Sequence, residues 1–183
     1  MTSLTIYADA APYDRIADIA DFAGIAETVA TAGVGLERWA AAEDLTGAAD
    51  DAAILAAYSA EISALKARGG YQAVDVVRLT PDHPARAEMR ARFLAEHVHD
   101  DDEVRFFVEG SGLFYIRHGG RVLALECTAG DLVVLPAGTR HWFDTGAEPL
   151  FAALRLFSRP EGWAARFTGD AIAEAIPLYE RAA

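Results

Sequence analysis

The chain has 183 residues, the size of one domain, and its composition of 52% hydrophobic and 24% charged residues is typical of a globular protein with a buried core. A formal net charge of −12 repels phosphate backbones and anionic lipid, so we expect no nucleic acid and no membrane as partners. One cysteine, Cys127, excludes an intrachain disulfide, and the first residues resemble no secretory signal, so we expect a cytoplasmic protein.

Residues 1–70 are Ala-rich and show mostly helical patterning. A short strand is expected at 3–7 and a helix at 25–32, before a glycine. The clearest helix is expected at 50–68, where large apolar residues recur every three or four positions before a Gly-Gly stop: Ile54, Tyr58, Ile62 and Leu65.

From residue 71 the pattern changes to short strands. We expect a strand at 71–79 and a short helix from Pro84 to about residue 94. Turn residues then separate six predicted strands: 104–109, 113–118, 122–127, 132–135, 141–144 and 151–157. Many short strands at even spacing predict an antiparallel sandwich or barrel. We therefore predict one domain, 1–183, with a mostly helical part (1–70), a β-barrel core (71–160) and a tail (161–183) that is partly helical around 170–175.

The segment 96–103 contains the first candidate metal ligands. His97 and His99 are two residues apart, so their side chains share one face of an extended strand. Glu103 keeps the same parity if the acidic residues before it form a bulge or tight turn. Two imidazoles and one carboxylate are a common ligand set for non-haem iron and related divalent metals.

A second segment supplies a fourth candidate ligand, His141. Gly130 permits one tight turn, Pro136 and Gly138 shape another, and His141 then begins a new strand. In a small barrel this imidazole can face the first three ligands across the interior. Alone, a His-x-His pair or an acidic run is usually a solvated loop, but the two segments together favour a metal site.

These spacings resemble the two cupin motifs, with Ala91 in place of the usual glycine and Thr145 in place of the expected asparagine. Neither departure removes a ligand. The strings EHVHDDDEVRFFVEGSGLFYIR, LPAGTRHWFDTG, ALRLFSRPEGWAARFTGD and GVGLERW resemble the acireductone dioxygenase family over nearly the whole chain. The resemblance implies a mainly β fold: a cupin-type double-stranded β-helix (jelly-roll barrel) with N-terminal helices packed outside the barrel.

The resemblance also implies an oxidoreductase of methionine salvage with one Fe(II) or Ni(II) per chain. Enzymes of that family cleave acireductone, 1,2-dihydroxy-3-keto-5-methylthiopentene, with dioxygen. Fe(II) gives formate and 4-methylthio-2-oxobutanoate, whereas Ni(II) gives formate, carbon monoxide and 3-methylthiopropionate. The ligand set is compatible with this chemistry, because four protein ligands on an octahedral metal leave two positions for a chelating enediolate. We expect the metal to act mainly as a Lewis acid and template.

Arg105 lies two residues after Glu103, so strand parity turns it toward the same interior. The resemblance assigns it the role of stabilising the second negative charge of a substrate dianion, which suits a guanidinium. The alternative is a structural salt bridge with Asp101 or Asp102.

Three aromatic residues match the family's apolar pocket for the methylthio tail: Phe93, Phe143 and Trp163. Core packing explains such residues equally well. Arg155 has inward parity on a late strand and suits either anion binding or a buried ion pair.

Glu96 and Asp102 flank the ligands and are candidates for orienting the imidazoles or aiding metal entry, although we expect Glu96 to lie on the surface. Other functions remain open from the residues alone: a different cupin dioxygenase, a sugar-phosphate isomerase, or a cupin that only binds a ligand. An isomerase needs a larger basic cluster than Arg105 and Arg155 provide, and binding-only cupins commonly lose the metal ligands. We expect a monomer that acts on acireductone and O2.

Overall fold

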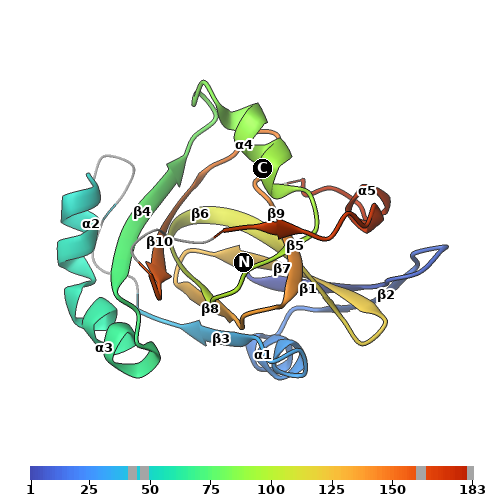
Figure 1. Ribbon diagram of the computed structural model, residues 1–183, viewed down its shortest axis with the longest axis horizontal. Coiled ribbons are helices and arrows are strands. Elements are labelled where there is room, and N and C mark those ends of the chain that lie inside the picture. Colours follow the sequence, from blue (N-terminus) through green and yellow to red (C-terminus); the bar gives the residue numbers. More distant parts are fainter. Residues whose placement is uncertain (41–44, 46–49, 160–163, 181–183) are drawn as a thin grey trace.

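The computed structural model describes residues 1–40, 45, 50–159 and 164–180. Two antiparallel sheets share one long strand, β6 (Glu103–His118), and together form a barrel (Figure 1). One sheet also contains β11 (Arg166–Phe167), β5 (His97–Val98), β9 (Arg140–Asp144), β7 (Arg121–Thr128), β1 (Ser3–Ala8) and β2 (Arg15–Ile19). The other contains β4 (Ala73–Leu79), β10 (Phe151–Phe157), β8 (Asp131–Leu135) and β3 (Gly35–Arg38). The mainly β, cupin-type barrel predicted from the sequence is confirmed.

Strand β6 passes from one sheet to the other at Gly110. Before this glycine β6 pairs with β8 and β10, and after it with β7 and β9. Gly110 has φ +69°, and a Cβ there would lie 1.8 Å from the Leu150 carbonyl oxygen, so only glycine fits. The prediction of two strands, 104–109 and 113–118, with a turn between them was therefore wrong. Gly110 bends one continuous strand.

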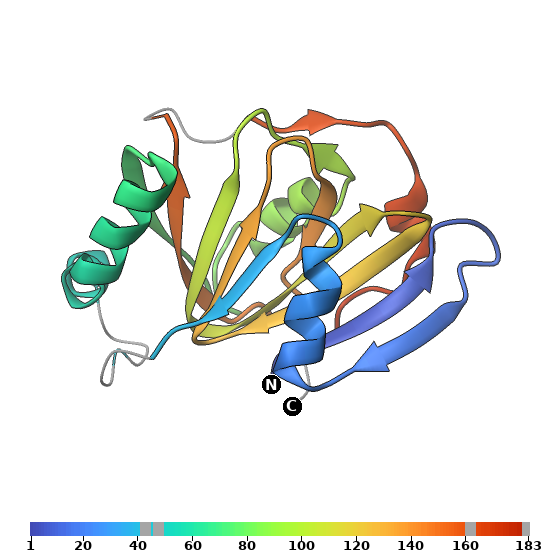
Figure 2. The same cartoon turned by 90° about the horizontal axis from the view of Figure 1, so that it is seen from below.

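The main core lies between the two sheets. Aromatic rings fill its centre, where Phe107, Phe114, Phe143 and Phe151 are all nearly inaccessible to solvent. Helix α1 (Phe22–Ala30) closes one end of this core with Ile25 and Val29 (Figure 2). The helix begins three residues earlier than the predicted 25–32, because the Asp21 carboxylate caps it by accepting from the Gly24 N–H at 2.7 Å.

Two helices cover the outer face of the second sheet, as predicted for the N-terminal part. They are α2 (Asp51–Ala57) and α3 (Ser59–Gly69), which replace the single helix expected at 50–68. The break falls at Tyr58, whose φ of −102° and ψ of 21° are not helical and whose ring packs 4.8 Å from that of Phe106. The four predicted apolar positions are buried, so the pattern found the right face.

The first 70 residues contain more β structure than the predicted mostly helical part. Strands β1, β2 and β3 extend the two sheets through pairs with β7 and β8. Strands β2 and β3 have only four or five residues, too few for a clear alternating pattern. The predicted helix after Pro84 is α4 (Arg86–Phe93), and the helical part of the tail is α5 (Ile172–Ala175). Within the described residues, no helix is long and apolar enough to span a membrane.

Candidate metal centre

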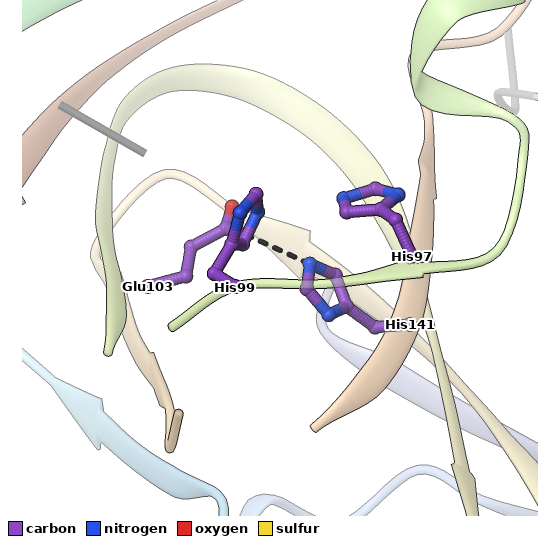
Figure 3. A group of neighbouring side chains, drawn as sticks. All are labelled: His97, His99, Glu103 and His141. Carbon is purple, nitrogen blue, oxygen red and sulfur yellow. Dashed lines mark hydrogen bonds and ion pairs between the residues drawn. The ribbon is translucent and has the colours of Figure 1, made fainter. Parts of the chain in front are cut away.

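Four side chains converge inside the barrel, as the sequence predicts (Figure 3). His97 lies on β5, His99 just after it, Glu103 at the start of β6 and His141 on β9. Their ligand atoms all lie within 4.8 Å of one another, and each of the four residues is buried. Three imidazoles and one carboxylate at this separation form a site for one divalent cation.

Local backbone geometry brings these side chains together. His97 and His141 are register partners in the β5–β9 pair, so their imidazoles share one face, with ring centroids 4.4 Å apart. The turn before His141 depends on Gly138, which has φ +77° and donates its N–H to the His99 carbonyl at 2.9 Å. The two sequence segments are thus joined at the ligands.

Backbone carbonyls orient all three imidazoles. The Nδ1 atoms of His97, His99 and His141 donate to the carbonyls of Ala95, Ala164 and Thr139 at 2.7, 3.0 and 2.8 Å. Because a carbonyl can only accept, Nδ1 of each ring carries a proton, and Nε2 is the atom directed toward the other ligands. Two Nε2 atoms already face the same Glu103 oxygen, His141 at 2.9 Å and His99 at 3.2 Å.

The protonation states suit a cation. Burial and the neighbouring His141 lower the pKa of His97 to about 4, so this ring is neutral at physiological pH. The pKa of Glu103 lies well below its ordinary value, although burial alone would raise it, because Arg105, His141 and His99 stabilise the carboxylate. Metal ligands must be deprotonated, and these two groups already are.

Arg105 binds the second oxygen of Glu103. Its Nη2 donates to Glu103 Oε1 at 2.8 Å, so Arg105 forms an ion pair with one of the candidate metal ligands. Its guanidinium also lies over the ring of Phe143, 4.4 Å from the centroid. Burial lowers the pKa of Arg105 and Glu103 opposes this, but a guanidinium keeps its charge in proteins. Its buried Nε has no hydrogen-bond partner among the described residues.

A cavity of about 370 Å³ opens onto the ligands, within the usual range for small-molecule sites. Its wall includes the predicted residues Phe93, Phe143, Arg105 and Arg155. Arg155 is also bound to Asp75 through two hydrogen bonds of 2.9 and 2.6 Å, but this ion pair is partly exposed and not buried as considered from the sequence. Trp163 lies outside the described residues.

The expectation that Glu96 is exposed was wrong, because only 1% of its surface is accessible. Its carboxylate accepts from Thr168 Oγ1 at 2.5 Å and from Arg117 at 3.4 Å, so it is directed toward the C-terminal segment. Asp102 accepts from the Ala137 N–H at 3.0 Å and from Tyr71 Oη at 3.3 Å. It thereby holds the turn that precedes His141.

Sequence reasoning missed three residues of the cavity wall: Arg92, Ala165 and Phe167. Arg92 adjoins the predicted Phe93, but consecutive residues on a helix point in different directions, so this adjacency gave no clear signal. Ala165 and Phe167 belong to a segment whose strand, β11, has only two residues and no readable alternation. Their place at the cavity follows from pairing with β5, which the sequence does not reveal.

A barrel that holds three histidines and one glutamate at a single point defines a metal-binding cupin. The model of the ARD/ARD' family matches residues 3–165, and the chain belongs to this family. An acireductone dioxygenase of Parvibaculum lavamentivorans is 55% identical over 98% of both chains, and one of Synechococcus is 51% identical over 97% of this chain and 99% of its own. A solved acireductone dioxygenase from Bacillus anthracis, with a cadmium ion in its active centre, superposes with a TM-score of 0.78 at 31% identity, covering 91% of this chain and 98% of that one.

Proposed function

We propose that this protein cleaves acireductone with dioxygen, as an enzyme of methionine salvage. The observation that carries the proposal is the convergence of four buried ligand atoms at the base of a cavity that also contains a buried arginine. Family membership and relatives named acireductone dioxygenase at more than 50% identity support the same activity.

The donor set fits one Fe(II) or Ni(II) per chain. Nitrogen and carboxylate oxygen donors suit both ions, and the Nδ1 contacts direct each Nε2 atom toward the ionised Glu103. When bound, the ion would supply Lewis-acid chemistry to the two adjacent oxygens of an enediolate. With Fe(II) the products would be formate and 4-methylthio-2-oxobutanoate; with Ni(II), formate, carbon monoxide and 3-methylthiopropionate.

Arg105 has the chemistry to stabilise a substrate dianion. Its guanidinium is buried beside the ligands, and Glu103 and the face of Phe143 hold it in place. Its Nε–H has no hydrogen-bond partner in the part of the chain that the structure describes. A cation in a water-poor site favours ionisation of an acidic enediol and retains the charge that results. Arg155, fixed by Asp75, adds positive charge to the same wall.

Phe93 and Phe143 provide the apolar wall for the methylthio tail. Their rings meet edge to face with centroids 6.4 Å apart, and both line the cavity. Asp102 acts as a positioning residue through the turn before His141. Because one chain supplies all four ligands, we propose that the protein works as a monomer, in the cytoplasm.

Anaerobic metal reconstitution tests the activity. Metal-free protein is loaded with Fe(II) or Ni(II), mixed with acireductone and O2, and the products are separated by mass spectrometry. We expect formate in both samples and carbon monoxide in the nickel sample alone. Metal-free protein that consumes acireductone as fast as the loaded samples would contradict the proposal.

A further inference from the structure

Strand β11 carries a large apolar side chain to the edge of the metal cavity. The segment before α5 crosses one end of the barrel in Figure 2. Within it, Phe167 lines the cavity and meets the His97 ring edge to face, with centroids 5.9 Å apart. Yet 57% of Phe167 is exposed. The phenyl ring therefore stands between the ligands and solvent.

The position of Phe167 is set by contacts with the ligand strand. Phe167 is the register partner of His97, so both side chains lie on the same face of the β11–β5 pair. The next residue, Thr168, donates its N–H to the Glu96 carbonyl at 3.0 Å and its hydroxyl to the Glu96 carboxylate at 2.5 Å. Because Glu96 immediately precedes His97, the ring is held at a defined place relative to the metal ligands.

The exposure of Phe167 needs an explanation that packing does not give. Four large apolar residues are exposed in the described part of the chain: Met1, Ile16, Phe167 and Leu178. Of these, Phe167 is the one that lines the cavity. An apolar ring at the edge of a binding site loses contact with water when an apolar group enters, and this burial favours binding.

We propose that Phe167 is a specificity-determining residue that covers the apolar tail of the substrate. The inference rests on the proposed function and adds a wall on the solvent side to the wall formed by Phe93 and Phe143. Thr168 and Glu96 are positioning residues, since they hold β11 without lining the cavity themselves. The size and apolarity of the substrate tail are thereby selected by Phe167 at the entrance of the cavity as well as by Phe93 and Phe143 inside it.

The test compares two substrates in the Fe(II)-loaded enzyme. One is acireductone, and the other is an analogue with a methyl group in place of the methylthioethyl chain. For Phe167→Ala we expect KM for acireductone to rise about tenfold, the effect of losing contact with one or two methylene-sized groups, while kcat stays within about twofold. KM for the short analogue should not change. Leu178→Ala, which removes an equally exposed side chain (55%) away from the cavity, is the matched control.

Thr168→Val is a second test variant. It should raise KM for acireductone as Phe167→Ala does, but by a smaller factor. It keeps the shape of the side chain and removes the hydroxyl that binds Glu96, so KM for acireductone should rise about threefold with bound iron unchanged. Equal KM changes for both substrates in Phe167→Ala, or no change for either, would overturn the inference while acireductone cleavage by the wild type still stood. A wild type that cleaves neither substrate would overturn the proposed function, and the inference with it.

Discussion

Two buried carboxylates lie at opposite ends of the same pair of strands, and their surroundings differ. Glu103 begins β6 and is the register partner of Leu135, whereas Asp131 begins β8, four residues before Leu135. Glu103 is 3% exposed and Asp131 is 0% exposed. Both charges are withdrawn from water at a comparable cost, so the difference between them lies in the groups that they face.

Asp131 accepts hydrogen bonds from two distant residues and from one nearby backbone N–H. It accepts from Arg38 at 2.7 and 3.1 Å, from Thr2 Oγ1 at 2.5 Å and from the Thr128 N–H at 2.8 Å. These contacts join the residue before β1, strand β3 and the end of β7 to β8, at the opposite end of the β6–β8 pair from Glu103. A buried charge with its hydrogen bonds complete is a structural element.

Glu103 has a different set of neighbours. Two imidazole Nε2 atoms face one of its oxygens, and the arginine that binds the other has an Nε–H without a partner among the described residues. A cation bound at this point would replace the two Nε2–Glu103 contacts, while the Nε–H of Arg105 can donate to an anion beside it. The comparison teaches that a buried charge is recognised as functional by the polar atoms around it that are incompletely paired.

Neutralising Glu103 should have the largest effect on activity. Glu103→Gln keeps the size of the side chain and an oxygen that accepts from Arg105, but it removes the charged metal ligand. We expect acireductone cleavage to fall by at least about a thousandfold, equivalent to roughly 4 kcal/mol, and bound metal to fall below one per chain. Metal analysis and steady-state rates measure both. A variant that kept a full complement of metal and its rate would remove Glu103 from the ligand set.

The matched change at the other carboxylate should act on stability instead. Asp131→Asn leaves Arg38 and Thr2 with an incomplete acceptor, and we expect a loss of about 3 kcal/mol in the free energy of unfolding. For a chain of this size that lowers the melting temperature by roughly 6–12 °C. Bound metal and KM of the folded protein should match the wild type. Asp18→Ala, at an exposed ion pair with Arg15, is the control and should melt close to the wild type. Loss of metal in Asp131→Asn would contradict the assignment of a structural role to Asp131 and of metal binding to Glu103.

The metal ligands could be predicted because their signal is local. His97 and His99 share a strand face by spacing alone, and Gly138 shapes the turn that presents His141. The barrel was predictable for the same reason, since each strand and its turn residues are close in sequence.

The burial of Glu96 and Asp131 was not predictable, because each depends on a partner that is remote in the sequence. Glu96 is buried through Thr168, 72 residues away, and Asp131 through Thr2, 129 residues away. Asp131 in fact follows a turn signal at Gly130, which favours a surface position. Gly110 caused a different error. The sequence predicted that a strand ends there, but a glycine with positive φ can also bend a strand that continues. In these cases the outcome depends on contacts between residues that are far apart in the sequence.

Arg105 tests whether the incompletely paired donor beside Glu103 contributes to catalysis. Arg105→Ala should keep its metal, because all four ligands remain, but lower kcat/KM by about a hundredfold at neutral pH. Without the guanidinium the substrate must lose its second proton to solvent. The pH profile of kcat/KM should therefore shift to higher pH, and Arg105→Lys should restore part of the rate. An unchanged rate and profile would make Arg105 a structural partner of Glu103.

The smallest effect should come from an ion pair that lacks burial. Arg166 on β11 donates to Asp100 at 2.8 Å, a distance equal to that of the Arg105–Glu103 pair, but both side chains are 64% exposed. Water and salt screen such a pair, and an ordered arginine costs conformational entropy, so Arg166→Ala should shift the melting temperature by under about 2 °C. KM for acireductone should stay within about twofold, because backbone pairing and Thr168 still hold β11 on the ligand strand. A tenfold rise in KM would show instead that charge at the surface, and not the pairing beneath it, holds Phe167 over the cavity.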